Sequence, residues 1–499
     1  MFQKLFIICL FAAVTIGIAM YTRKKSSNVG DFVLGGRAVG PWLTAFSYGT
    51  AYFSSVVFVG YAGQFGWNYG VAAAWIGIGN AFVGSLLAWA LLGRRTRVMT
   101  KHLESATMPD FFGKRYNTKA LKIAASIIIF VFLVPYSASV YKGLSGLFAL
   151  TFGIDFSYCI IGMAVLTGIY VISGGYKAAV LNDLIQGFIM IGGICLVVVF
   201  VLNGNGGFVA SIEKLSQIPC DVNPAFHGAY TSFLGPDPIG LLSVVILTSV
   251  GTWGLPQMIH KFYTIKDEKS IRSGMVISTV FALIIAGGSY FIGAFGRLYY
   301  TTAGAVAYDE IVPLMVEKAL PDLLIGVVLI LVLSASMSTL SSLVLASSST
   351  FTLDFLGGLF FKDMKQKTQM VIIRCLCGCF ILLSVVIALN PNNLITTLMS
   401  ISWGALAGAF LGPFLYGLFW KKATAISVWV SFAVGIGITV SNLVFPYTTP
   451  PMAGALAIVS SFFVVPLVSL ITPKLSEKHI EKTFACYGDN LTLPSEKNN

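Results

Sequence analysis

Apolar segments of about twenty residues recur along the whole chain, and they set its fold class. Each is long enough to cross a bilayer as an α-helix, which takes roughly 20 apolar residues. None shows the ~10-residue alternation of polar and apolar residues that marks an outer-membrane barrel. Only 10% of the 499 residues are charged, against roughly 25% in soluble proteins. We therefore predict an all-α, polytopic membrane protein.

The apolar segments predict one transmembrane domain with thirteen crossings. Its parts are an extra N-terminal helix (residues 2–21), a first five-helix repeat (41–203), a second five-helix repeat (239–419), two C-terminal helices (424–471) and a cytoplasmic tail (472–499). An N-terminus outside and a C-terminus inside place the basic segments Arg94–Arg97 and Lys261–Arg272 in the cytoplasm, as the positive-inside rule requires. The net charge of +12 therefore indicates orientation and not an affinity for nucleic acid.

Two of the predicted helices are interrupted near their middle. Helix two, residues 41–64, contains Gly49, Thr50 and Ser54–Ser55, and helix seven, residues 239–260, contains the run VGTWGLPQ. They occupy the first place in the two groups of five helices. Paired interruptions at matching places indicate an inverted-repeat transporter with its site at the membrane midplane. The alternative is a pair of Gly/Pro kinks whose backbone groups are satisfied by neighbouring helices.

The segment Leu331–Thr350 is apolar enough for a membrane, yet twelve of its twenty positions are Ser, Thr or Ala. Ser334, Ser338 and Ser341 recur at spacings of four and three, which places their hydroxyls on one side of a helix. Such a face can supply oxygen ligands to a hard monovalent cation such as sodium. It can equally serve close packing between helices. Composition alone leaves both interpretations open.

Asp183 is predicted at the cytoplasmic start of helix six, in the run VLND. Acidic residues in or at the edge of a membrane are costly and usually functional. The other interpretation is an N-cap, because Asp favours that position of a helix. The two roles are compatible.

Catalytic chemistry finds little support in the sequence. The four histidines, His102, His227, His260 and His479, fall in predicted loops or at helix ends, and no nucleophile motif or metal-binding set accompanies them. We therefore expect no enzyme and no organic cofactor. A solute sensor of the same architecture is less favoured, because residues 472–499 are too few for a kinase or receiver domain.

Four motifs in order, LGGRAVGPW, ISGGYKAAVLNDLIQ, GLPQMIHKFYTIKD and SASMSTLSS, resemble the sodium:solute symporter family. That family includes the sodium/glucose, sodium/proline and sodium/pantothenate transporters, and the resemblance covers nearly the whole chain. It implies a five-plus-five inverted repeat of leucine-transporter type. It also implies sodium-coupled symport of a small solute by alternating access, through a protein of the plasma (inner) membrane that functions as a monomer.

The resemblance also implies which residues hold the coupling ion. The family's shared sodium site falls on the carbonyls of Thr50, Phe53 and Ala335 and on the hydroxyls of Ser338 and Thr339. Some relatives carry a second sodium site nearer the cytoplasm, and its pattern falls on Asp183, Ser338, Ser341 and Ser342.

The solute is less closely defined. Tyr52 stands where proline transporters have Asp and sugar transporters often have Asn, and a Tyr there resembles pantothenate-type and some monocarboxylate-type members. The residues expected to line the pocket are Tyr52, Ser55, Tyr136, Ser249, Thr252 and Trp253. Aromatic rings, hydroxyls and half-helix N-termini suit a small carboxylate. We expect an organic acid such as pantothenate or a monocarboxylate, or an amino acid such as proline, with a sugar as the alternative.

Overall fold

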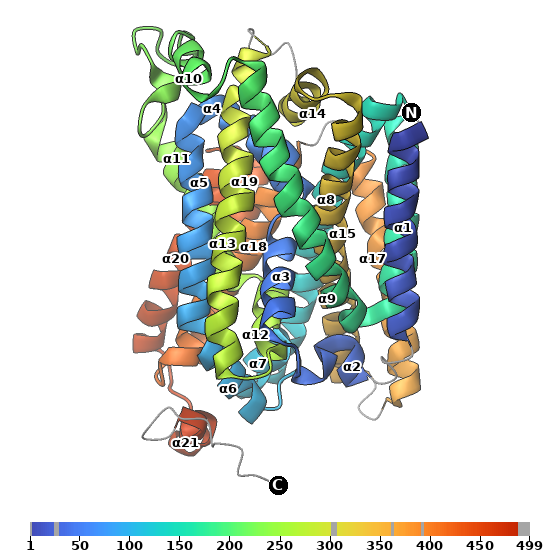
Figure 1. Ribbon diagram of the computed structural model, residues 1–499. Helices are drawn as coiled ribbons and strands as arrows, with labels where there is room; N and C mark the ends of the chain where they lie inside the picture. The colour runs from blue at the N-terminus through green and yellow to red at the C-terminus, as the bar shows by residue number, and fades with distance from the viewer. Residues whose placement is uncertain (1, 24–28, 301–306, 361–363, 391–393, 488–499) are drawn as a thin grey trace.

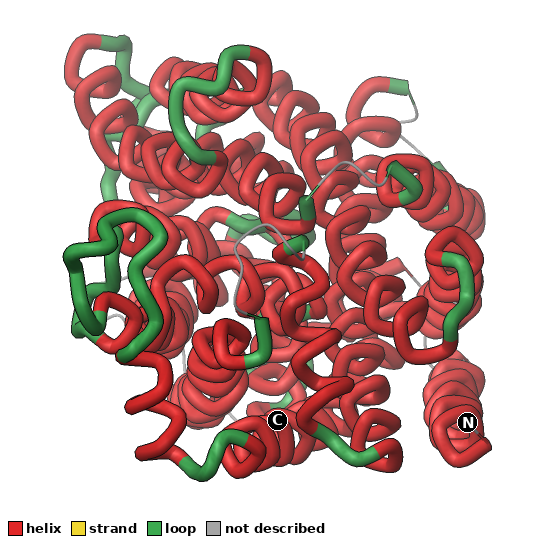
Figure 2. Tube along the Cα trace, turned by 90° about the horizontal axis from the view of Figure 1, so that it is seen from above, coloured by secondary structure: helices red, strands yellow, loops and turns green. Residues whose placement is uncertain are grey.

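The computed structural model describes residues 2–23, 29–300, 307–360, 364–390 and 394–487, and these residues form a bundle of helices (Figures 1 and 2). Within them the only β pairing is a single bridge between Val39 and Ile265. The fold is therefore all-helical where it is described, as predicted. The last part of the predicted tail, residues 488–499, lies outside the described residues.

The described residues in the first half of the chain form fifteen helical elements, of which those marked η are 3-10 or π turns. They are α1 (Phe2–Arg23), α2 (Val29–Leu34), η1 (Gly35–Arg37), α3 (Pro41–Tyr52), η2 (Val56–Tyr61), α4 (Ala62–Tyr69), η3 (Gly70–Ala73), α5 (Ala74–Gly79), η4 (Asn80–Leu87), η5 (Trp89–Gly93), α6 (Arg94–His102), α7 (Met108–Arg115), α8 (Lys119–Phe152), α9 (Phe156–Gly204) and α10 (Phe208–Ser216).

The second half repeats the alternation of long helices and short turns. Its elements are η6 (Ala229–Thr231), α11 (Pro238–Val245), η7 (Ile246–Val250), η8 (Gly251–Gly254), α12 (Pro256–Thr264), α13 (Glu268–Gly293), η9 (Ala294–Leu298), α14 (Tyr308–Ala319), α15 (Asp322–Thr350), η10 (Phe351–Leu356), α16 (Gly357–Leu359), α17 (Gln366–Ala388), α18 (Ile395–Phe419), α19 (Ala425–Val444), α20 (Pro450–Ile471), α21 (Glu477–Phe484) and η11 (Ala485–Tyr487).

Nine helices among the described residues are long and apolar enough to cross a membrane, and the bent pair Pro238–Gly254 and Pro256–Thr264 makes a tenth. The protein is therefore a multi-pass membrane protein. In Figure 1, α10 and α14 lie at the upper end of the bundle, and α2, α6, α7 and α21 lie at the lower end. The helix α1 begins at the upper end and α21 lies beyond the lower one, so the described chain starts and finishes at opposite ends.

The turn between predicted helices five and six is tighter than expected. The sequence predicts a tight cytoplasmic turn made by the whole run SGGYKAAVLND, but residues on both sides of Gly175 are helical and belong to α9. The whole reversal rests on Gly175, whose φ of 62° and ψ of −164° a side chain would strain. A Cβ there would also lie 2.5 Å from the ring of Phe32. Asp183 therefore sits two turns inside a helix, and its interpretation as an N-cap is wrong.

Predicted helix two also continues into the next helix without a loop. The run from Val56 to His102 is continuously helical over 47 residues, and it changes direction at Gly70. Gly70 has a φ of 60°, and a Cβ on it would lie 2.1 Å from the carbonyl oxygen of Tyr230. A glycine allows both the backbone angle and the close contact.

Small residues hold α18, α19 and α20 together. A Cβ on Gly435 of α19 would lie 2.3 Å from the backbone carbon of Gly408 in α18. A Cβ on Gly404 of α18 would lie 2.7 Å from the Cα of Gly454 in α20. Backbones this close are typical of helix pairs in membranes, where small residues permit extensive van der Waals contact.

Leucine at Gly435 is expected to destabilise the protein by about 3 kcal/mol, because the side chain would have to separate two helix backbones. Gly437, two residues further along α19, is the matched control, since a Cβ on it would meet no atom within 4 Å. We expect Gly435→Leu to lower the thermal melting temperature in detergent, measured by size-exclusion fluorescence. Gly437→Leu should leave it unchanged. Equal melting temperatures for the two variants would show that the contact is not needed.

Candidate ion and solute site

The helix that begins at Pro41 breaks after Tyr52. Phe53 leaves the helical conformation, with φ −110° and ψ 101°, and its amide donates to the carbonyl of Gly49. Ser54 then starts the next element, because its Oγ accepts the amide of Val56 at 3.2 Å. Carbonyls in the last turn of a helix have no partner within that helix. The break therefore leaves backbone oxygen atoms of α3 free to bind something else.

The hydroxyl-rich helix α15 lies against this break. Thr339 Oγ1 lies 3.2 Å from the carbonyl oxygen of Thr50, 3.3 Å from that of Ala51 and 3.1 Å from that of Ala335 in its own helix. Ser338 Oγ donates to Thr50 Oγ1 at 2.7 Å. All five residues are buried.

This group has more hydrogen-bond acceptors than donors. The hydroxyl of Thr339 has one proton, so it can donate to only one of three carbonyls. Thr50 Oγ1 already donates to the carbonyl of Phe46 at 2.8 Å. The carbonyl oxygens of Thr50 and Ala51, which lie at the break, thus converge with the hydroxyls of Ser338 and Thr339, and a hard monovalent cation binds such a set of oxygen ligands.

Four of the five residues predicted for the shared sodium site are brought together here: Thr50, Ala335, Ser338 and Thr339. The fifth, Phe53, lies at the break and lines a small cavity together with Ala335. The prediction missed the carbonyl of Ala51, although its place next to Thr50 in a helix that was expected to be interrupted could have suggested it.

A second polar group lies one turn away, around Asp183. Ser47 Oγ of α3 donates to Asp183 Oδ2 at 2.5 Å. Lys261 Nζ of α12 donates to Ser47 Oγ at 2.7 Å and to Ser342 Oγ at 3.1 Å. Asp183, Ser47 and Lys261 are almost entirely buried, and Ser342 is 7% exposed. Of the predicted second site, the structure therefore joins Asp183 and Ser342 in one network.

The other two predicted members of the second site have different partners. Ser338 lies close to Asp183 and donates to Thr50, so it links the two groups. Ser341 donates to the carbonyl of Ser338 at 2.8 Å within α15. Lys261 was expected at the start of a cytoplasmic loop, and that expectation is wrong because α12 continues through Thr264 and buries it.

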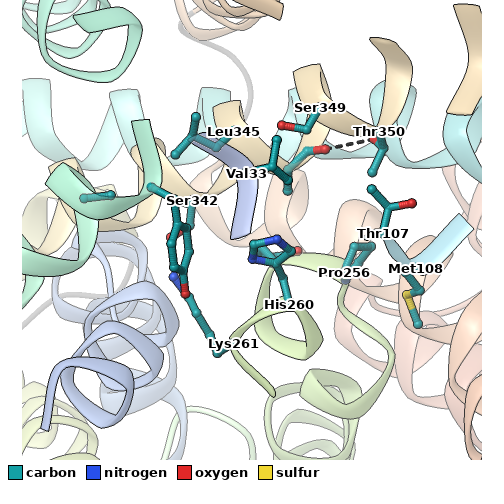
Figure 3. Close-up of a pocket in the computed structure, with 14 residues that line it drawn as sticks. Val33, Thr107, Met108, Pro256, His260, Lys261, Ser342, Leu345, Ser349 and Thr350 are labelled. Atoms are coloured by element: carbon teal, nitrogen blue, oxygen red, sulfur yellow. Dashed lines mark hydrogen bonds between the residues drawn. The ribbon is translucent and has the colours of Figure 1, made fainter. Parts of the chain in front are cut away.

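A cavity adjoins the Asp183 group (Figure 3), and its lining includes residues of α2 and α7, which lie at the lower end in Figure 1. His260 and Lys261 of α12 face it on one side, and Ser342, Ser349 and Thr350 of α15 face it on another. Further along its wall, both amide atoms of the Gln257 side chain are buried without a hydrogen-bond partner. The cavity thus offers polar groups next to the network.

Five of the six residues predicted to line the solute pocket are already bonded within the protein. They donate from Tyr52 to Thr248 O at 2.5 Å, from Ser55 to Val140 O at 2.9 Å, from Ser249 to Asn80 Oδ1 at 3.0 Å, from Thr252 to Ser249 O at 2.8 Å and from Trp253 to Val83 O at 3.1 Å. The sixth, Tyr136, is buried with a hydroxyl that has no partner.

Tyr136 belongs to a group of unpaired polar atoms whose other members were not predicted. Its ring meets the indole of Trp403 edge-on, with centroids 5.8 Å apart, and Trp403 also faces Tyr52 at 6.1 Å. The hydroxyl of Tyr61 lies close to Ser400, one turn before Trp403 in α18. Among the described residues, Tyr61 Oη, Tyr136 Oη, Ser400 Oγ and Trp403 Nε1 are all buried without a well-formed hydrogen bond, although Tyr61 lies close to Ser400 and Tyr136 close to Trp403.

The combination has a simple chemical consequence. Buried polar groups are normally hydrogen-bonded, so a cluster of unpaired ones marks a place for a ligand or water. The indole N–H can only donate, and the hydroxyls can donate as well. The site therefore suits a solute with acceptor oxygens. A Ser and a Trp one turn apart in the middle of an apolar helix, SISWGALAG, would have been the signal in the sequence.

The short helix α14 covers the outer half of the broken helix at the upper end of the bundle. The carbonyl of Tyr308 approaches Gly63 of α4 so closely that a Cβ there would lie 2.3 Å away. Asp309 Oδ2 accepts the amide of Ile395, the first residue of α18, at 3.1 Å. One carboxylate thus ties α14 to the start of α18.

Burial raises the pKa of Asp309 to about 6, although the Ile395 amide and Lys142 partly offset this. Because the folded protein disfavours the charged form, stability from this group is full below about pH 4 and is lost as the pH rises through about 6. The loss is at most roughly 3 kcal/mol, and less where solvent screens this partly exposed group. Asp309→Asn lacks the titrating carboxyl. We therefore expect the melting temperature of the wild type to fall relative to that of Asp309→Asn as the pH rises from 4.5 to 8. A constant difference would contradict this.

Comparisons with known proteins identify the family to which the chain belongs. The profile of the sodium:solute symporter family matches residues 32–435. A sodium/proline symporter of Haemophilus influenzae is 30% identical over 439 residues, with 86% of each chain covered. The osmoregulated proline transporter OpuE of Bacillus subtilis is 27% identical, covering 94% of each chain. A sodium/pantothenate symporter of Haemophilus influenzae is also 27% identical, covering 95% of this chain and 96% of its own.

Solved structures support the fold. A sodium-coupled sialic acid symporter in a substrate-bound, outward-open state superposes with a TM-score of 0.75 at 18% identity, covering 96% of this chain and 99% of its own. A nucleobase-cation-symport-1 family transporter in a closed conformation gives a TM-score of 0.54 at 14% identity, covering 91% and 97%.

A helical membrane bundle with two broken helices around a buried oxygen-rich site has the organisation of a secondary transporter. The chain belongs to the sodium:solute symporter family. It is a sodium-coupled solute symporter, and it is a transporter and not an enzyme.

Proposed function

We propose that the protein imports a small carboxylate together with sodium, by alternating access across the plasma membrane. The best candidates for the solute are an amino acid such as proline and an organic acid such as pantothenate. The site itself is charge-free at its centre, and its unpaired atoms are donors on Tyr61, Tyr136, Ser400 and Trp403. A carboxylate accepts hydrogen bonds from such groups without needing a charged partner, and these charge-assisted bonds are about twice as strong as neutral ones.

The coupling ion binds where α3 breaks against α15. The observation that carries this assignment is the excess of acceptor oxygens around Thr339, whose single hydroxyl proton faces three carbonyls. The proposed ligands are the carbonyls of Thr50, Phe53 and Ala335 and the hydroxyls of Ser338 and Thr339, with the carbonyl of Ala51 as a further candidate. Sodium there would hold the two elements together and shape the adjacent solute pocket.

Release of the ion toward the cytoplasm would let α3 and α15 separate, and the solute would follow. Each charge that falls through 100 mV supplies about 2.3 kcal/mol. One sodium ion therefore supports roughly fiftyfold accumulation from voltage alone, since about 1.4 kcal/mol corresponds to a factor of ten.

The topology proposed for this function is thirteen crossings in two inverted five-helix repeats, with the N-terminus outside and the C-terminus inside. Two observations support it. The described chain begins and finishes at opposite ends of the bundle. Basic residues such as Arg94 and Arg95 of α6 gather at the lower end, which makes that end cytoplasmic by the positive-inside rule. We propose that a single chain in the bilayer suffices, because both sites are built from its own helices.

The relatives narrow the choice of solute only partly. Several are named as proline symporters and one as a pantothenate symporter, and both solutes carry a carboxylate. Tyr52 does not decide between them, because its hydroxyl is committed to the carbonyl of Thr248. A sugar is the alternative, and it would have to be bound by the same donors without a charge.

The test is a screen of uptake into proteoliposomes at single-chain occupancy, with an inward sodium gradient or with choline in its place. The solutes are proline, pantothenate, pyruvate, acetate and glucose, each radiolabelled. We expect one of the carboxylates to accumulate only with sodium and faster with an inside-negative potential. Sodium-independent uptake at the same rate would refute the coupling, and sodium-driven glucose uptake alone would refute the carboxylate.

A further inference from the structure

Lys261 places a positive charge inside the membrane-embedded part of the protein. It lies on α12, five residues after Pro256 begins that helix, and it is 2% exposed. Figure 3 shows it beside Ser342, at the edge of the cavity described above. A buried lysine is costly unless its charge is balanced and its donors are bonded. Its surroundings bond two of its three donors and place one carboxylate nearby, joined to it through Ser47, although Asp183 Oδ1 has no hydrogen-bond partner among the described residues.

The ammonium group is held by oxygen atoms and balanced by one carboxylate. It donates to Ser47 Oγ at 2.7 Å and to Ser342 Oγ at 3.1 Å. Ser47 in turn donates to Asp183 Oδ2 at 2.5 Å. The ring of Tyr176 lies with its centroid 5.3 Å from Lys261 Nζ, which adds a cation–π contact. The local charge is neutral with the lysine present.

The polar group around Thr339 and the polar group around Asp183 both lie between α3 and α15, one helical turn apart. Ser47 and Thr50 are three residues apart on α3, and Ser338 and Ser342 are four residues apart on α15. Such spacings place side chains on one face, stacked about 5 Å apart along the axis. Among the described residues, the upper level holds the carbonyls of the break and no charged side chain, whereas the lower level holds Asp183 and Lys261.

We propose that the ammonium of Lys261 is the resident cation of the lower level, in place of a second sodium ion, so that the chain couples transport to one sodium alone. This inference rests on the proposed function, since it takes the upper level as the sodium site. Lys261 bonds Ser342, one of the residues predicted to bind a second sodium ion, and Ser47, which itself bonds the predicted ligand Asp183. A sodium ion added there would also leave one positive charge unbalanced in the membrane. Because Lys261 is tethered, it keeps α3, α9, α12 and α15 in contact at the lower level without being released.

The test counts sodium ions on the purified, full-length protein in nanodiscs, by equilibrium dialysis with radioactive sodium and no solute. We expect one ion per wild-type chain. Lys261→Ala removes the ammonium and its stem and leaves Asp183 unbalanced, so we expect two. Lys261→Arg keeps a cation and should stay at one. The double variant Asp183→Asn with Lys261→Ala removes the carboxylate as well and should return to one.

Lys177 provides the matched control. It lies on α9 and pairs with Asp31 at 2.7 Å, outside the network, so Lys177→Gln should still bind one ion. Lys261→Gln is the second variant to be used if the alanine variant does not elute as a single folded species, and it should also bind two. Two ions on the wild type, or one ion on folded Lys261→Ala or Lys261→Gln, would overturn the inference and leave the proposed function standing. No bound sodium on the wild type would overturn both.

Discussion

Alanine at both Ser338 and Thr339 is expected to abolish sodium-stimulated uptake. Both hydroxyls face the broken end of α3, where they meet oxygen atoms of Thr50 and Ala51. A hydrogen-bonding group that contacts a charge contributes about 1.5–3 kcal/mol. Losing two such groups removes roughly 3–6 kcal/mol, so sodium affinity should fall more than a hundredfold. Radioactive sodium binding and the sodium dependence of uptake measure this directly.

Ser336 is the matched control for this change. It lies on the same helix and is equally buried, but its hydroxyl donates to the carbonyl of Val332 at 2.7 Å and stays within α15. Ser336→Ala should therefore keep the wild-type sodium affinity. If the Ser338/Thr339 double variant reaches the membrane and takes up solute with wild-type sodium dependence, the ion binds elsewhere.

Two local signals in the sequence pointed to the region of the proposed ion site, and the resemblance to the family supplied its individual residues. Glycine and hydroxyl residues around Thr50 indicated that helix two would break, and the spacing of Ser338 from its neighbours indicated a polar face. Neither signal alone separated packing from binding. The structure brings the two together, with Thr339 within 3.3 Å of two carbonyls at the break, and this supports the proposed ion site.

The remaining parts depend on contacts between distant segments. Lys261 looked like the first residue of a basic loop. The sequence does not show that α12 points this side chain toward Ser47, which lies 214 residues earlier in the chain. Asp183 looked like the start of a helix because the eleven-residue run SGGYKAAVLND was expected to form the turn before it. In the structure the single residue Gly175 makes that turn. Trp403 was not predicted, because a tryptophan in an apolar helix is usually a packing residue and its spacing from Ser400 was the one signal to the contrary.

The lining of the solute pocket was also beyond what the sequence could predict. Its predicted lining was chosen for polar character near the two breaks, and most of those groups turn out to stabilise the breaks themselves. Ser249 and Thr252, for example, bond to Asn80 and to the backbone beside them. The atoms left for a solute are those whose partners are missing, and only a structure identifies them.

Phenylalanine at Tyr136 is expected to raise the KM for the solute without lowering stability. Its hydroxyl lies close to Trp403 and Ser54 but makes no well-formed hydrogen bond with any described residue, so its removal costs the folded state little. If that hydroxyl donates to the solute carboxylate, its loss removes about 1.5–3 kcal/mol of binding. The KM should then rise roughly tenfold to a hundredfold, measured by sodium-driven uptake, while the melting temperature without solute stays within the error of the wild type.

Tyr141 is the matched control, one and a half turns along the same helix α8. It is also buried with an unpaired hydroxyl, but it lies toward Thr167 of α9 and away from Trp403. Tyr141→Phe should therefore leave the KM unchanged. Because the two variants make the same chemical change in equally buried positions, a general effect of losing a tyrosine hydroxyl would raise both KM values. Only a solute bound between α8 and α18 raises one of them, and an unchanged KM for Tyr136→Phe would place the carboxylate elsewhere.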